Sequence, residues 1–399
     1  MEPSTEFRTL LDLVSPPGQG PPDFQELEAR YSWVQDMADC PQSHLRHQEG
    51  NIWVHSRMVM EELREELVWQ ELPPEQREIL LLAALLHDIG KPERFFGERG
   101  EALAGGHARR GEILARKILW EMEAPLEVRE AVAQLIRFHQ EVFRLFESER
   151  PDRLVREMSW CVRTDLLWLL AMANARGRVS SNRDELLAAV ELFRGAAEEA
   201  GCFRRPYPFP SAQSRMEWLR SPHRNPLYPA HDDTRCEMVV LCGLPGSGKS
   251  YWAWEHLPDT PAEGYDRVRR RLKLPFGSNE GRVRQEGRER IRVRLRAGES
   301  FVFESNALTR DLRSQLVGLA MDYGARVRIV HVEAAPAVRA GWNVDREEAV
   351  PVDAFLRMLD RWEFPTALEG HGVEAVVHGD PHLFRPRTLS VRPWGWDGG

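Results

Sequence analysis

The stretch ILLLAALLHDIGKP, residues 79–92, decides the fold expected of the N-terminal half. An uninterrupted aliphatic run of this kind is typical of a buried helix, because none of its faces is polar. His87 and Asp88 follow the run directly, and Gly90 is expected to close the helix. Histidine and aspartate are both metal ligands, so the run predicts a buried helix with two ligands fixed at its C-terminal end.

Helical periodicity extends on both sides of this stretch. From about residue 31 to residue 192, apolar residues recur at helical spacing, with breaks at Pro73, Gly90, Gly105, Pro125 and Pro151. This half is predicted to be all-α. Because a domain comprises roughly 100–200 residues, the 399-residue chain should contain a second one.

The sequence changes character after residue 202. Prolines and aromatic residues are frequent in the following segment, which predicts an ordered linker. Beyond it, short β-type runs alternate with helical stretches, at 238–242, 300–305, 327–334 and 373–378. This alternation predicts an α/β domain with a mostly parallel sheet. The expected order is an N-terminal extension (1–30), a helical domain (31–202), the linker (203–235) and the α/β domain (236–399).

The composition limits the class of protein. The formal net charge of −8 argues against coating of nucleic acid by the whole chain but leaves room for a local basic groove. Residues 282–298, RVRQEGRERIRVRLRAG, contain arginines at many helical positions and either line such a groove or form a solvated face or a domain contact. Five scattered cysteines, no signal-peptide pattern and no apolar run of about 20 residues predict a cytoplasmic protein without a membrane partner.

Further candidate metal ligands are distributed along the predicted helices. They are His55, His107, His139 and Asp165. One histidine on an apolar helix is more often a hydrogen-bonded core residue than a ligand, but the whole set indicates a cation site. A set of histidines and carboxylates without thiolates suits Mn²⁺, Fe²⁺, Co²⁺, Ni²⁺, Mg²⁺ or Zn²⁺, and the sequence does not choose among them.

The order His55, then His87 with Asp88, then Asp165 resembles the H…HD…D pattern of the HD-domain metal phosphohydrolases. The resemblance implies an all-α HD fold in which these four residues hold a metal ion. Members with two metals have two additional histidines, and His107 and His139 stand at the matching places. Two ions sharing Asp88 would hold a phosphate and activate a water for attack on phosphorus.

Basic residues follow the expected ligands closely. Lys91, Arg109 and Arg110 are predicted to neutralise phosphate oxygens, although the arginines are equally compatible with ordinary surface charges. The segment before the first ligand resembles a histidine-rich lead-in found in HD domains near nucleotidyltransferases. That resemblance implies that His44 and His47 face the substrate.

A second site is indicated by GLPGSGKS, which matches GxxxxGK[ST] and lies between a predicted strand and a predicted helix. In this context the backbone N–H groups of the loop hold the phosphates of a nucleotide. Lys249 is expected to reach the β and γ phosphates of ATP, and Ser250 to bind Mg²⁺. The other residues of the expected nucleotide loop are Gly243, Leu244, Pro245, Gly246, Ser247 and Gly248.

The segment YDRVRR resembles the acceptor site of the polynucleotide kinase family. The resemblance implies that Asp266 is the general base and that Arg269 binds a phosphate of the acceptor. Alternatively, Asp266 has a purely structural role and caps a helix. Gly264 departs from the family, which usually has Ser or Thr before the acid. FESNALTRDLR resembles a supporting segment with Glu304 as its acid, and WNVDREEAVP resembles a lid that contributes Arg346.

The two resemblances together match a bacterial architecture that joins an HD phosphohydrolase to a polynucleotide kinase. They imply an enzyme that heals RNA or DNA ends and works before a separate ligase. Its kinase would phosphorylate a 5′-hydroxyl, and its HD site would remove a 2′,3′-cyclic or terminal 2′ or 3′ phosphate. Two alternatives are a small nucleoside or nucleotide kinase fused to a nucleotide phosphohydrolase, and a P-loop ATPase switch that regulates the HD half.

Overall fold

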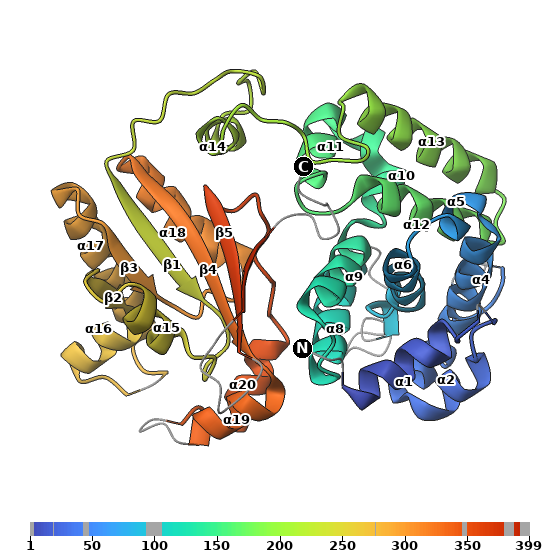
Figure 1. Ribbon diagram of the computed structural model, residues 1–399, viewed down its shortest axis with the longest axis horizontal. Helices are drawn as coiled ribbons and strands as arrows, with labels where there is room; N and C mark the ends of the chain where they lie inside the picture. Colours follow the sequence, from blue (N-terminus) through green and yellow to red (C-terminus); the bar gives the residue numbers. More distant parts are fainter. Residues whose placement is uncertain are drawn as a thin grey trace. The chain divides into compact units, whose positions relative to one another are not determined.

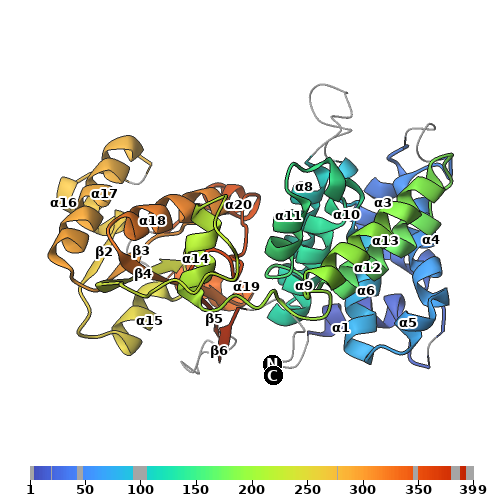
Figure 2. The same ribbon diagram turned by 90° about the horizontal axis from the view of Figure 1, so that it is seen from above.

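The computed structural model describes residues 4–18, 20–42, 48–92, 106–275, 277–344, 349–378 and 387–391. The chain divides into two compact units, which meet between Pro208 and Phe209 along the sequence (Figures 1 and 2). Within the described ranges, no helix combines the length and apolar character that a membrane span needs. The five cysteines form no disulfide.

The N-terminal unit is helical, which confirms the all-α prediction. Its helices are α1 (Thr5–Val14), α2 (Phe24–Arg30), α3 (Ser32–Ala38), α4 (Ile52–Glu65), α5 (Leu67–Gln70), α6 (Pro74–Leu86), α8 (His107–Glu121), α9 (Leu126–Phe138), α10 (Glu141–Arg144), α11 (Pro151–Met158), α12 (Thr164–Arg176) and α13 (Arg183–Glu199). The first two helices belong to this packed unit: Phe7 and Leu27 are buried, and Ser4 donates a hydrogen bond to the Met122 carbonyl.

Helix α6 is the central helix of this unit. Pro74 is at its first turn, where a missing N–H costs nothing, and all residues from Ile79 to Leu86 are buried. Helices α4, α9 and α12 pack against it. Each leucine buried in this way stabilises the fold by about 1.5–3 kcal/mol relative to an exposed one. The end of α6 is therefore held from several sides.

The second unit contains a six-stranded sheet in the order β2-β3-β1-β4-β5-β6. All neighbouring strands are parallel except β5 and β6, which are antiparallel, so the sheet is mostly parallel as predicted. The strands are β1 (Cys236–Cys242), β2 (Ala262–Gly264), β3 (Phe301–Glu304), β4 (Ala325–Ala334), β5 (Gly372–His378) and β6 (Arg387–Ser390). The sequence did not predict β2 and β6, because both are short and neither is an apolar run.

Seven described helices accompany this sheet. They are α14 (Ala212–Arg220), α15 (Lys249–His256), α16 (Tyr265–Leu272), α17 (Glu280–Ala297), α18 (Arg310–Asp322), α19 (Pro336–Val344) and α20 (Val352–Leu359) (Figure 1). The predicted linker contains α14, whose Arg215 donates to the Gly370 carbonyl at 2.8 Å and whose Trp218 is buried. This helix is therefore part of the sheet unit.

One apolar cluster joins α15 to the sheet. Trp252 and Ala253 of α15 are buried against valines and a leucine of four strands, Val239, Leu241, Val302, Val330, Val332 and Val376. Because α15 begins at Lys249, this packing fixes the position of the loop between β1 and α15.

Candidate metal centre and phosphate-binding cleft

The His-Asp pair lies directly after α6, and a close approach of two backbones brings a third ligand to it. A Cβ on Gly90 would lie 2.3 Å from the carbonyl oxygen of His107 and 2.6 Å from the backbone nitrogen of Gly111. Only glycine permits this contact between the turn after α6 and the start of α8. Gly90 has no positive φ, so its role is close packing and not the left-handed helix closure that the sequence suggested.

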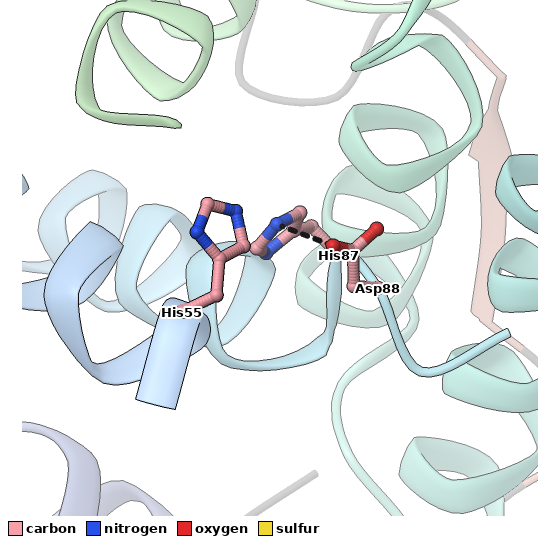
Figure 3. Close-up of side chains that lie close together, drawn as sticks. All are labelled: His55, His87 and Asp88. Carbon is pink, nitrogen blue, oxygen red and sulfur yellow. Dashed lines mark ion pairs between the residues drawn. The ribbon is translucent and has the colours of Figure 1, made fainter. Parts of the chain in front are cut away.

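Two clusters of potential ligands share one carboxylate. His55, His87 and Asp88 form the first, and Asp88, His107 and His139 form the second, with ligand atoms within 4.8 Å of one another in each. Oδ2 of Asp88 is 3.3 Å from Nε2 of His87, the ion pair drawn in Figure 3. Oδ1 of Asp88 is 3.6 Å from Nε2 of His107 and 3.8 Å from Nε2 of His139.

The histidine rings are oriented by their outer nitrogens. Nδ1 of His87 lies 2.8 Å from the Ala84 carbonyl oxygen, and Nδ1 of His139 lies 2.6 Å from the Ile136 carbonyl oxygen. Each carbonyl requires a proton on Nδ1, which leaves Nε2 as a lone-pair donor. Within the described residues, Nε2 of His87 and His139 and Oδ1 of Asp88 are buried and have no hydrogen-bond partner. Such a set of inward-facing donors fits a divalent cation.

The pKa values of these groups favour the forms that bind cations. Burial lowers the pKa of His55 to about 4, against the raising effect of Glu49, and burial lowers the pKa of His139 well below its ordinary value. Burial alone would raise the pKa of Asp88, but the positive charge of Lys91 leads the effects that outweigh burial and hold that pKa well below its ordinary value. Near neutral pH the imidazoles of His55 and His139 are therefore neutral, and the carboxylate of Asp88 is ionised.

Two supporting residues were not found from the sequence. Glu49 has a side chain that is 1% exposed and places a carboxylate oxygen 2.9 Å from Nδ1 of His55. Gln42 accepts a hydrogen bond at 2.8 Å from Lys91, which also donates to Oδ2 of Asp88 at 2.5 Å. Both residues precede α4 in an irregular segment, so no periodic pattern marks them.

The remaining predictions for this half have different outcomes. Asp165 is absent from both clusters; it lies in the first turn of α12, where Oδ2 accepts from Arg163 at 2.5 Å and Oδ1 accepts at 3.1 Å. Arg109 and Arg110 lie in the first turn of α8, next to His107. His44 and His47 lie outside the described residues.

The phosphate loop lies at the end of β1, as its motif predicts. Gly248 precedes the first turn of α15, whose N-terminus points its N–H groups into the loop. The Lys249 ammonium donates to the carbonyls of Gly243 at 3.0 Å and Leu244 at 2.8 Å. Ser250 donates from Oγ to Oε2 of Glu304 at 2.7 Å, so the hydroxyl predicted to bind Mg²⁺ lies beside the acid of the predicted supporting segment.

The predicted acceptor residues open onto the same cavity as the loop. This cavity has a volume of about 1470 Å³, and its lining includes Lys249, Ser250, Asp266, Arg269 and Glu304. Arg269 donates to Asp266 at 2.6 Å and to both carboxylate oxygens of Glu280 at 2.8 Å. The Asp266 side chain is 69% exposed and lines the cavity.

The close approach of two strands explains why position 264 is glycine and not the Ser or Thr of the family pattern. A Cβ at this position would lie 2.6 Å from the carbonyl oxygen of Glu304, because β2 and β3 pair tightly here. Ser or Thr would therefore force the two strands apart. Arg346, the predicted lid arginine, lies outside the described residues.

Family models match one segment in each unit. The HD domain model matches residues 52–163, and the AAA domain model matches residues 238–365. A curated relative, the CC-adding tRNA nucleotidyltransferase of Thermus thermophilus, is 40% identical over 106 residues. That match covers 26% of this chain and 23% of the relative, so the chain spans about a quarter of the relative's length.

Two solved structures match part of the chain. A candidate kinase from Chloroflexus aurantiacus J-10-fl is 16% identical, with a TM-score of 0.31, 38% of this chain covered and 88% of that chain covered. A sugar kinase from Janibacter sp. HTCC2649 is 21% identical, with a TM-score of 0.27 and coverages of 36% and 85%. By its family matches and its fold, the chain joins a helical HD domain to a C-terminal α/β P-loop domain of the AAA type.

Proposed function

We propose that this chain is a bifunctional enzyme that heals nucleic-acid ends. Its P-loop domain phosphorylates a 5′-hydroxyl with ATP, and its HD domain removes a 2′,3′-cyclic or terminal 2′ or 3′ phosphate. The observation that supports the first activity most directly is that Asp266 and Lys249 line one cavity. The observation that supports the second is that two ligand clusters share Asp88.

The HD reaction depends on the donors gathered at the end of α6. Asp88 and the four histidines would hold one or two divalent cations, for which Mn²⁺, Co²⁺, Ni²⁺ and Zn²⁺ suit the nitrogen and oxygen donors. A cation bound there polarises a phosphoryl oxygen and lowers the pKa of water. Lys91 adds a positive charge beside the shared carboxylate, where it balances the charge of a phosphate group.

The kinase reaction uses the residues around the loop. Lys249 and the loop N–H groups bind the β and γ phosphates, and Ser250 with Glu304 would hold Mg²⁺, which neutralises charge on the transferred phosphate. Asp266 accepts the proton of the attacking hydroxyl, and Arg269 binds a phosphate of the acceptor.

The name of the curated relative, a CC-adding tRNA nucleotidyltransferase, supports RNA as the substrate. A separate ligase would then join the healed ends. The test is an RNA with a 5′-hydroxyl and a 2′,3′-cyclic phosphate, incubated with labelled ATP with and without Mn²⁺. Label should enter the 5′ end, and Mn²⁺ should promote opening of the cyclic end. ATP hydrolysis without a labelled acceptor would instead support the ATPase switch, and faster labelling of free nucleosides would support the small-nucleotide kinase.

A further inference from the structure

The main cavity of the P-loop domain is basic although the whole chain is acidic. Among the described residues, eight Lys or Arg side chains and three carboxylates line it, whereas the chain has a net charge of −8. Its volume of about 1470 Å³ exceeds the roughly 300–1,000 Å³ of an ordinary small-molecule pocket. The excess of positive charge and the size of this cavity suit a polyanion longer than one nucleotide.

One wall of the cavity is a face of α17. Arg284 and Arg288 line the main cavity, and together with Arg292 they line an adjoining hollow of about 470 Å³. These three arginines are four residues apart, so they lie on one side of the helix, about 6 Å from one another along its axis. The basic lining therefore continues from the cavity along the helix.

The arginines of α17 differ in their partners. Arg284 and Arg288 form no ion pair with a carboxylate of the described residues, and Arg288 donates only to the neutral amide of Gln315 at 2.6 Å. By contrast, Arg290 lies 3.6 Å from Glu286, and Arg292 and Arg296 lie 3.2 and 3.0 Å from Glu289. A simple solvated face would mix arginines with acids throughout. Here the cavity side retains its positive charge.

Packing connects this face to the acceptor site. A Cβ on Gly287 would lie 2.7 Å from the ring of Tyr265, the residue before Asp266, so only glycine lets α17 lie this close to α16. Arg269 binds both oxygens of Glu280 at the start of α17. The arginine face and Asp266 therefore belong to one packed assembly.

We propose that Arg284 and Arg288 bind successive phosphates of a single-stranded nucleic acid whose 5′ end lies at Asp266. This inference rests on the proposed kinase function and specifies its substrate as a strand. Arginine is the residue best suited to phosphate oxygens, because its planar fork donates two parallel hydrogen bonds. Contacts of this kind read the backbone and not the bases, so they tolerate any sequence.

The test compares two double variants of the full chain with the same loss of charge. Arg284→Gln/Arg288→Gln removes cavity arginines, and Arg290→Gln/Arg296→Gln removes arginines that pair with acids. Binding is measured by fluorescence anisotropy with a labelled RNA of about 10 nucleotides, within the site sizes of about 4–16 nucleotides known for single-strand binders.

The first double variant should raise Kd at least about tenfold and flatten the salt dependence by about 0.7 per lost phosphate contact. The second should change Kd by less than about twofold, and both should bind ATP as the unaltered protein does. Equal effects of the two variants would overturn the inference, and so would binding of a blunt duplex as tight as binding of the single strand.

The inference and the proposed function fail separately. If the cavity arginines are needed for RNA binding but no 5′-hydroxyl becomes labelled, the strand site stands and the kinase assignment falls. If 5′ ends are phosphorylated while the Arg284→Gln/Arg288→Gln variant binds RNA normally, the kinase assignment stands and the strand site falls.

Discussion

Glu49 places a carboxylate oxygen 2.9 Å from Nδ1 of His55, and both side chains are buried. A carboxylate in this position holds the proton on Nδ1 and turns Nε2 toward the ligand cluster. Such outer partners of a metal-binding histidine fix its tautomer and its orientation. This relationship adds a residue to the candidate metal centre that the HD pattern alone does not include.

Glu49→Gln should weaken cation binding about 10–100-fold, because the amide no longer fixes the histidine tautomer. Isothermal titration with Mn²⁺ measures the change without reference to activity. Glu61→Gln, an exposed residue of α4, is the matched control and should bind Mn²⁺ normally. An unaltered affinity in Glu49→Gln would show that Glu49 does not support the site.

Asp88→Asn should reduce phosphate removal on the order of 10³-fold and leave the 5′ kinase intact, because both clusters depend on this carboxylate. Lys249→Ala should have the opposite effect, since the loop lysine belongs to the P-loop unit and donates to the carbonyls of its own loop. Both activities are followed on one RNA labelled at each end. Loss of both activities from either substitution would contradict independent sites.

Asp266→Asn should lower the kcat of the kinase about 10²–10⁴-fold, the usual contribution of a general base. The KM for ATP should remain unchanged, because Asp266 is expected to contact the acceptor and not the nucleotide. Asp353→Asn provides the control, since Asp353 also lies in the first turn of a helix in this domain. A kcat that falls equally in both variants would assign Asp266 to capping.

Arg116→Met should destabilise the HD domain by about 3–5 kcal/mol, because it removes a buried cation from two buried carboxylates and leaves their charge only partly balanced by Arg129 and Arg137. Arg116 is 0% exposed and donates to Glu130 at 2.9 and 3.0 Å and to Glu112 at 2.7 Å. Urea unfolding followed by circular dichroism measures the loss. Arg153→Met removes a partly exposed pair with Glu157 and should cost about 1 kcal/mol or less.

His371 should make the attachment of α14 sensitive to acid. Its Nδ1 accepts from the Val327 N–H at 3.0 Å, and its Nε2 lies 2.7 Å from Oε1 of Gln213 in α14. The ring must therefore be neutral, and burial, aided by Arg326 and Arg215, lowers its pKa to about 4. The unfolded state binds a proton near pH 6.5, so this stabilisation is complete above that pH and decreases as the pH falls toward 4.

Hydrogen exchange of residues 212–220 at pH 7 and pH 5 tests this dependence. Protection of α14, corrected for the intrinsic rate, should fall at pH 5 in the unaltered protein. In His371→Gln, protection should be lower at pH 7 and change less with pH. Equal protection at both pH values in the unaltered protein would contradict a role for the neutral ring.

Several features were predictable because they depend on local patterns. The apolar residues before His87 predict a buried helix, and the glycines and lysine of the loop before Ser250 predict a nucleotide site in its correct strand-to-helix context. The main strands were also predicted, since β1, β4 and β5 are apolar runs. These features depend on neighbouring residues alone.

Other features depend on contacts between distant segments. Glycine is required at position 90 because the carbonyl of His107 approaches it closely, and at position 264 because the carbonyl of Glu304 does. Neither close approach can be predicted from the neighbouring residues in the sequence. Glu49 lies in an irregular segment, and its role depends on how that segment packs beside α4. The HD pattern also predicts Asp165 as a metal ligand, whereas in the structure its carboxylate accepts a hydrogen bond from Arg163, two positions earlier.

The two oxygens of Asp88 are not equivalent, and this asymmetry has a consequence for the order in which ions load. Oδ2 is already engaged by the Lys91 ammonium at 2.5 Å, whereas the ion pairs of Oδ1 with described residues are those with the imidazoles of His107 and His139. The first ion should enter beside His107 and His139, and a second must displace the lysine from Oδ2. Titration should then give a two-step isotherm whose weaker step disappears as a separate event in Lys91→Met.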